Sequence, residues 1–174
     1  AAPGKVAHRD YEYVRRGTAN IFCIVEMLAG RHLTHATKNR KRASFARAIK
    51  RIADAYPHAA RIHLIMDNLN THCRKSLTET FGEREGGRIW GRFCIHHTPK
   101  HASWLNPAET EVGLWSRQCL GRRRIGTLAD LRIQTRCWNA QANRRKLKII
   151  WRFDTVDARR VFHYGQSTTS RSQH

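Results

Sequence analysis

Residues 62–72, Ile-His-Leu-Ile-Met-Asp-Asn-Leu-Asn-Thr-His, decide the fold class because a short apolar run ends directly on an acid, Asp67. A nearly continuous apolar run of this length is typical of a central strand that is covered on both faces. Open α/β sheets place their functional groups at the carboxyl ends of such strands. Asp67 is therefore a candidate site residue, and the alternative is that it only caps a following helix.

A second acid, Glu109, follows the helix start Asn106-Pro107. Asparagine accepts hydrogen bonds from free amides at a helix N-terminus, and proline suits the first turn because its missing N–H is not needed there. The alternative is that Glu109 only completes a reciprocal cap with Asn106. Glu111 lies about 200° further round the same helix, so the two glutamates cannot face one site.

The remaining pattern predicts an α/β (α+β) domain with a mixed sheet. In chain order we expect a hairpin of strands 18–28 and 31–36, a helix over 44–56 capped by Ser44, strand 62–66, helix 74–81, a charged loop over 82–91, strand 92–97, a helix from 106 to about 120, a long helix opened by a Thr127–Asp130 capping box, and a short helix over 157–162. One domain is expected over residues 1–164, and a disordered tail over 165–174.

The charge of the chain favours nucleic acid as its partner. Lysine and arginine number 33 against 13 acids, and the formal net charge of +20 is spread over the whole sequence. A broad basic face usually binds nucleic acid, and the alternative is a merely basic surface. No segment approaches the roughly 20 apolar residues of a spanning helix, and no signal peptide opens the chain, so no membrane partner is expected.

The five cysteines include no CxxC pair, and we interpret them as reduced thiols of a cytosolic protein. The nearest approach to a zinc motif is Cys94-Ile-His96-His97 with His101 close by. Because this pattern lacks a second paired half, the sequence does not lead us to expect a structural zinc site.

Asp67 and Glu109 have the oxygen ligands that Mg²⁺ or Mn²⁺ prefers. Two such ions roughly 4 Å apart stabilise both the attacking and the leaving oxygen of a phosphoryl transfer. Further polar residues crowd the two motifs. Asn68, Asn70, Trp104 and Asn106 are expected to support the site, and His72, Lys100, His101, Arg122, Arg123 and Arg124 to contact DNA. The alternatives are that His72 is an ordinary polar helix residue and that the three arginines are a solvated face.

Residues 67–72 and Thr98-Pro-Lys-His-Ala-Ser-Trp-Leu-Asn-Pro-Ala-Glu109 resemble the second and third acidic motifs of DDE transposases. The branch they resemble is the bacterial insertion sequence 630 family, which is related to the mariner elements. Residues 10–18 and 151–159 are similar to the same family, so the resemblance covers about residues 4–162.

The resemblance implies a ribonuclease H-like fold, with Asp67 as the second acid of the catalytic triad and Glu109 as the third. It implies DNA cleavage by metal-activated water, followed by strand transfer through attack of a 3′-hydroxyl. The implied partners are element ends and target DNA, bound by a homodimer in a synaptic complex. The implied location is the bacterial cytoplasm, at the nucleoid.

The first aspartate of the family lies upstream of the motif matched by Asp10, and the chain begins Ala-Ala-Pro-Gly without a methionine. We therefore expect an N-terminally truncated catalytic domain that lacks its first strand, has an incomplete two-metal site and is inactive alone. Two alternatives stay open. One is a non-catalytic, basic DNA-binding remnant of a transposable element, and the other is a ribonuclease H-like nuclease that acts on RNA–DNA hybrids.

Overall fold

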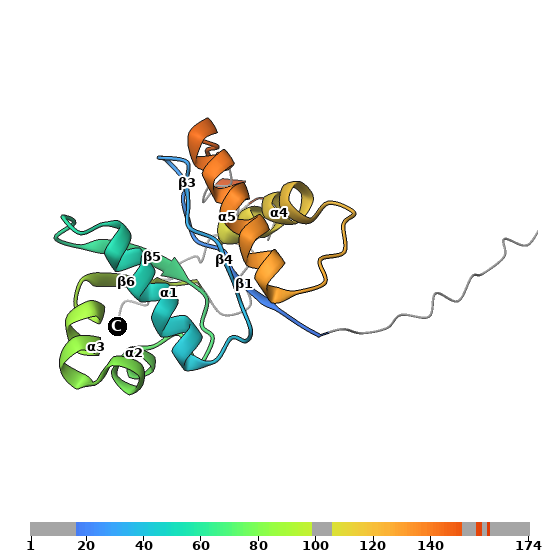
Figure 1. Cartoon of the computed structure of the whole chain (residues 1–174). Helices are drawn as coiled ribbons and strands as arrows, with labels where there is room; N and C mark the ends of the chain where they lie inside the picture. Colours follow the sequence, from blue (N-terminus) through green and yellow to red (C-terminus); the bar gives the residue numbers. More distant parts are fainter. Residues whose placement is uncertain (1–16, 99–105, 151–155, 158–159, 161–174) are drawn as a thin grey trace, which may run out of the picture.

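The computed structural model describes residues 17–98, 106–150, 156–157 and 160 (Figure 1). The expected short helix over 157–162 and the tail over 165–174 therefore fall largely or wholly outside the described residues. Within the described residues the protein is a mixed α/β structure with small sheets and five α-helices. None of these helices combines the length and the apolarity needed to cross a bilayer.

The N-terminal strands form the expected antiparallel hairpin. Its four segments are β1 (Asn20–Phe22), β2 (Val25–Glu26), β3 (Arg31–His32) and β4 (His35–Thr37). Asn20 lies opposite Thr37, and Glu26 lies opposite Arg31 in the same register. The two short ladders are therefore one continuous hairpin, joined where the Leu33 N–H donates to the Ile24 carbonyl at 2.9 Å.

Gly30 closes the hairpin turn in a conformation that requires glycine. Its φ of +62° lies in the left-handed region, and a Cβ there would stand 2.6 Å from the carbonyl carbon of Lys146. Glycine adopts such angles freely because it has no Cβ. The turn can therefore lie directly against the backbone that follows the last helix.

The middle of the chain builds the first hydrophobic core. Its elements are α1 (Arg42–Ala55), β5 (Ile62–Met66), α2 (Arg74–Phe81), α3 (Glu83–Trp90) and β6 (Phe93–His97). Phe45, Ile49 and Ile52 share one face of α1, as the spacing predicts, and they are buried with Leu77 and Ile89. The strands and α2 are confirmed. Helix α1 begins at Arg42, two residues before Ser44, so Ser44 is not its cap.

Two sequence predictions in this region are wrong. Residues 82–91 are not a loop, because α3 occupies most of them and packs on α2. Strand β5 is not covered on both faces within the described residues. It pairs in parallel with β6 alone, and His63 and Ile65 on its second face are exposed.

The C-terminal helices build a second core. Helix α4 (Ala108–Trp115) continues as a π-helix (Ser116–Leu120), and α5 spans Leu128–Arg145. Helix α4 begins at Ala108 with Pro107 as its N-cap, one residue after the predicted Asn106 cap, and Asn106 Oδ1 accepts the Ala108 N–H at 3.1 Å. The capping box is confirmed, since Thr127 Oγ1 accepts the Asp130 N–H at 3.1 Å. Trp115, Cys119, Trp138 and Ala142 form the centre of this core.

Polar side chains of α5 occupy the outer edge of the hairpin. Asn143 Oδ1 accepts the His32 N–H at 2.7 Å, and its Nδ2 donates to the His32 carbonyl at 3.1 Å. Asn139 Nδ2 donates to the Thr34 carbonyl at 2.6 Å, and Arg132 Nε donates to the Ala36 carbonyl at 3.2 Å. Backbone groups that would otherwise be left unpaired at this edge are satisfied by the helix.

The hairpin separates the two cores. Phe22 and Ile24 pack on the first core, whereas Ile21 packs on the second. This alternation follows from the opposite orientation of successive side chains in a strand. Helices α1–α3 lie on one side of the hairpin and helices α4 and α5 on the other (Figure 1). The described strands form three two-stranded ladders rather than the single mixed sheet that we expected.

Candidate active site

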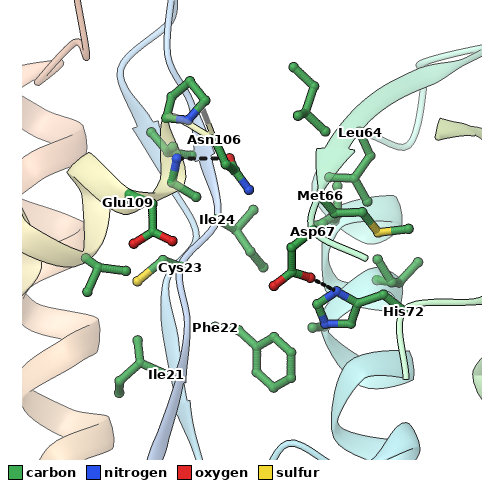
Figure 2. Close-up of a pocket in the computed structure, with 18 of the residues that line it drawn as sticks. Ile21, Phe22, Cys23, Ile24, Leu64, Met66, Asp67, His72, Asn106 and Glu109 are labelled. Atoms are coloured by element: carbon green, nitrogen blue, oxygen red, sulfur yellow. Dashed lines mark hydrogen bonds and ion pairs between the residues drawn. The ribbon is translucent and has the colours of Figure 1, made fainter. Parts of the chain in front are cut away.

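A cleft of about 610 Å³ lies between the hairpin and β5. Its walls include residues 20–28 of the hairpin, residues 63–67 of β5 and its end, and the start of α4. Asp67 and Glu109, which are 42 positions apart, both line it. Figure 2 shows Asp67 beside His72 on the β5 side of the cleft and Glu109 beside Cys23 on the α4 side, with the hairpin running between them in this view.

Asp67 is held at the end of β5 with its carboxylate half-exposed. Its Oδ1 accepts the Leu69 N–H at 3.3 Å, which fixes the turn after the strand. The same oxygen lies 2.6 Å from Nδ1 of His72, and the side chain of Asp67 is 48% exposed. The approach to His72 is electrostatic rather than well directed, because the ring nitrogen does not point along a normal hydrogen bond.

His72 is packed as a rigid neighbour of Asp67. Its ring stacks on Phe45 with centroids 4.4 Å apart and planes 22° apart. Burial lowers the pKa of His72, and this effect outweighs the opposing influence of the Asp67 carboxylate. The stacking on Phe45 holds the His72 ring against the Asp67 carboxylate. The ring orients Asp67 without neutralising it.

Glu109 and Glu111 have different environments on α4, as their angular separation predicts. Glu109 is exposed, and its carboxylate makes no hydrogen bond or salt bridge with any described residue. Glu111 is fully buried and accepts hydrogen bonds from His32 Nδ1 at 2.9 Å and from Thr34 Oγ1 at 2.8 Å. Glu111 thus stabilises the fold, and Glu109 is the acid available to a ligand.

Three cleft residues were missed by the sequence analysis. Glu26 lines the cleft, but its Oε2 accepts the hydroxyl of Tyr56 at 2.6 Å. Arg40 adds a positive charge to the wall. Cys23 lies near Glu109, and burial, followed by the charge of Glu111, raises its pKa to about 12. Only the fold brings these residues to the site, because none lies near either acidic motif in the sequence.

The other predicted residues are distributed unevenly. Asn106 lines the cleft with the two acids and His72. Asn68 does not line it, and its Nδ2 donates to the Thr98 carbonyl at 2.5 Å, which links the end of β5 to the end of β6. Asn70 does not line it either, and its carbonyl accepts the Cys73 thiol. Lys100, His101 and Trp104 lie outside the described residues.

The arginine cluster lies in the connection between the π-helix and α5, away from the cleft lining. Arg122, Arg123 and Arg124 are all exposed. Arg123 is tethered, since its guanidinium donates to the Cys119 carbonyl and to Gln134 Oε1. Such an exposed cluster is available to a polyanion but does not belong to the carboxylate site.

The donor set of the cleft fits a hard divalent cation. Two carboxylates line one cleft, and no lysine or arginine among the described residues forms a salt bridge with either of them. Mg²⁺ and Mn²⁺ bind one or two carboxylates, retain several waters and bridge to phosphate oxygens. The arrangement can hold such an ion against a phosphodiester.

Comparison with known families identifies the superfamily of the chain. A family model described as DDE superfamily endonuclease matches residues 1–132, and the chain belongs to this superfamily. Its endonucleases use divalent metal ions and act on DNA. No curated protein and no solved structure matches the chain.

Proposed function

We propose that the chain is the catalytic domain of a DNA transposase of the insertion sequence 630 branch, with Asp67 and Glu109 as metal-binding catalytic acids. One observation carries the proposal: Asp67 and Glu109, the acids of two motifs that are far apart in the sequence, line the same cleft. The domain extends over residues 1–164 in this proposal and acts at the bacterial nucleoid.

The arrangement of layers supports a ribonuclease H-like fold, in which helices flank a mixed sheet. The hairpin is antiparallel, β5 and β6 are parallel, and helices cover both sides of the hairpin. All residues from 20 to 28 and from 63 to 67 line the cleft, whichever way their side chains point. A strand that borders a cavity with one face contributes only every second residue, because successive side chains point to opposite faces. Lining by consecutive residues therefore means that these strands border the cleft with their edges.

We therefore propose that the cleft is the place of one further strand, between β1 and β5, which would join the separate ladders into one mixed sheet. Among the described strands, β1 pairs only with β4 and β5 only with β6. A carboxylate on that strand would lie between Asp67 and Glu109 and would supply the third metal ligand. Without it, the site binds a metal ion but does not complete a two-metal centre, so the described part is inactive alone.

Each residue has a separate task in the proposed reaction. Asp67 and Glu109 would hold the ions, which when bound activate water and stabilise the leaving oxygen. His72 keeps the Asp67 carboxylate in place. Neutral His72 leaves the full negative charge of Asp67 for the cation. Asn106 Oδ1 accepts the N–H of Ala108, the first residue of the helix that presents Glu109.

The positive charge of the chain would bind the DNA backbone. Arg40 contributes at the cleft, and Arg122, Arg123 and Arg124 contribute from the exposed connection before α5. Each phosphate that these residues neutralise should steepen the salt dependence of binding by about 0.9 in log–log slope. We place element ends and target DNA on this surface, in a homodimeric synaptic complex.

Mn²⁺ binding tests the metal site. Binding is measured by isothermal titration for the unaltered chain, for Asp67→Asn and Glu109→Gln, and for the matched controls Asp54→Asn and Glu83→Gln, which are exposed acids outside the cleft. We expect both site variants to weaken Mn²⁺ binding at least about tenfold and both controls to leave it unchanged. Equal affinity in all five proteins would refute the site.

Nicking of supercoiled DNA in Mn²⁺ tests the reaction. We expect little or no nicking by the described domain alone, and any nicking to disappear in both site variants. Nicking that survives in both variants would exclude these acids as catalytic. Salt-sensitive DNA binding without acid-dependent Mn²⁺ binding would favour the non-catalytic DNA-binding remnant, and preferential cleavage of an RNA–DNA hybrid would favour the other nuclease.

A further inference from the structure

The parallel pairing of β5 and β6 gathers two histidines and a cysteine on one face of the strand pair. His63 on β5 lies opposite Cys94 on β6, and His96 follows two residues later on the same face of β6. The ligand atoms of the three side chains all lie within 4.8 Å of one another. No other group of three potential ligands is this close in the described part of the chain.

The distances suit a tetrahedral metal ion. His63 Nδ1 and His96 Nε2 are 3.0 Å apart, and the two rings are nearly parallel, with planes 15° apart. Zinc–nitrogen bonds of about 2.0–2.1 Å and zinc–sulfur bonds of about 2.3 Å place neighbouring ligands of a tetrahedral site roughly 3.3–3.6 Å apart. A small outward rotation of the two rings would therefore open the position.

The chemistry of the ligands selects the ion. Imidazole and thiolate bind zinc and other late first-row metals, whereas Mg²⁺ and Mn²⁺ prefer oxygen. His63 and His96 are exposed and Cys94 is partly exposed, so an ion can reach all three. The strand pairing already fixes their separation, and this reduces the ordering that binding would require.

We propose that His63, Cys94 and His96 form a second metal site, of His₂Cys type, for Zn²⁺ or a similar late first-row ion. Water would take the fourth position, since the described residues offer three ligands. The site links two strands that otherwise share a single ladder, and it would therefore stabilise the strand that ends in Asp67.

This site differs from the carboxylate site in the chemistry of its ligands and in its position along β5. His63 lies on the same face of β5 as Asp67, four residues earlier, which corresponds to about 13 Å along a strand. His63 also lines the cleft, so the two sites share one surface. Because the His₂Cys site uses none of the residues of the carboxylate site, a test of zinc binding does not depend on whether the proposed transposase function is right.

Zinc binding to the full chain is the direct test. The metal-free chain is titrated with Zn²⁺ in competition with a chromophoric chelator, in the presence of millimolar Mg²⁺. We expect one high-affinity Zn²⁺ per chain, weakened at least about tenfold by Cys94→Ser and by His96→Gln. The matched controls are Cys137→Ser and His58→Gln, which alter an exposed cysteine and an exposed histidine elsewhere and should bind as the unaltered chain does.

Two further measurements distinguish coordination from a loss of folding. Cobalt(II) should give a thiolate-to-metal charge-transfer band that Cys94→Ser abolishes and Cys137→Ser retains. Zn²⁺ should raise the thermal midpoint of the unaltered chain but not that of His96→Gln, whose side chain is exposed and dispensable for packing. Absence of stoichiometric Zn²⁺ binding, or equal binding by both site variants and controls, would overturn the proposal.

Discussion

Glu109 and Glu111 allow a sharp test, because they are identical residues two positions apart on one helix and have opposite surroundings. His32 Nδ1 faces Glu111, and His32 Nε2 lies 2.8 Å from the Leu147 carbonyl. Both ring nitrogens face acceptors, an arrangement that favours the imidazolium. Burial alone would lower the pKa of His32, but the contacts with Glu111 and Leu147 raise it. The pair is therefore a buried ion pair, fully excluded from solvent on both sides.

The cost of removing Glu111 follows from these contacts. Glu111→Leu leaves the His32 ring and the Thr34 hydroxyl without their buried acceptor. Breaking a buried ion pair by removing one partner costs about 3–5 kcal/mol. Glu111→Gln keeps an acceptor oxygen and loses only the charge, so we expect a smaller cost of about 1–2 kcal/mol. Glu109→Leu should change stability by less than about 0.5 kcal/mol because Glu109 is exposed and has no partner among the described residues.

Urea unfolding followed by far-ultraviolet circular dichroism measures the free energy of unfolding of all three variants. The same proteins are titrated with Mn²⁺, and there the order should invert: Glu109→Leu loses binding, and Glu111→Gln retains it. A loss below about 1 kcal/mol in Glu111→Leu, or a loss in Glu109→Leu as large as that in Glu111→Leu, would refute the assignment of one acid to the fold and the other to the site.

Four other predictions concern titration, the hairpin turn and thiol reactivity. Burial, followed by the charge of Arg51, lowers the pKa of His35 from 6.5 to about 4. The contribution of neutral His35 to stability is therefore complete above pH 6.5 and is lost as pH falls to 4. Urea unfolding across that range should show a loss of at most about 3 kcal/mol in the free energy of unfolding, and the His35→Phe variant should not show this loss. Burial would lower the pKa of His32, but its contacts with Glu111 and Leu147 outweigh burial and raise it. The contribution of His32 to the free energy of unfolding is therefore complete below pH 6.5 and falls as pH rises through the folded pKa. A Glu111→Gln variant whose stability falls with rising pH as that of the unaltered chain does would contradict this. Gly30→Ala should lower the free energy of unfolding by about 2–4 kcal/mol, because Gly30 has a positive φ and a Cβ there would stand 2.6 Å from Lys146. Gly126→Ala is the control: its Cβ would meet no atom within 4 Å, so thermal unfolding should be nearly unchanged. Burial raises the pKa of Cys23 to about 12, whereas Cys137 is exposed. Mass spectrometry after brief iodoacetamide treatment at pH 8 should therefore find Cys137 alkylated and Cys23 unmodified. Rapid labelling of Cys23 in the folded protein would contradict this prediction.

Local sequence patterns were sufficient for most of the helices and strands. The apolar run before Asp67, the Asn106-Pro107 start and the Thr127–Asp130 box each depend on interactions within a few residues, and each appears in the structure. The separation of Glu109 from Glu111 was predictable for the same reason, since it follows from helix geometry alone.

Features that depend on contacts between distant segments were not predictable. Residues 82–91 were interpreted as a charged loop, yet Gly86 lies against α2, where a Cβ would stand 2.6 Å from the Leu77 carbonyl carbon. The glycine there permits close helix packing rather than a turn. His63 was not recognised as a ligand because its pairing with Cys94 depends on the register of two parallel strands. The exposure of the second face of β5 was not predictable either, because the apolar run does not specify which other segments of the chain pack against that face.

The side chains of α5 on the outer edge of the hairpin restrict how this protein can associate with itself. Asn143 bonds backbone groups of His32 on β3, and Asn139 bonds the carbonyl of Thr34 just before β4. These groups could otherwise recruit a strand from another molecule. The hairpin edge that stays open within the described residues is the one beside the cleft. Edge-to-edge self-assembly through the hairpin would therefore cover Asp67 and Glu109, so aggregation by this route and metal-dependent chemistry would be mutually exclusive.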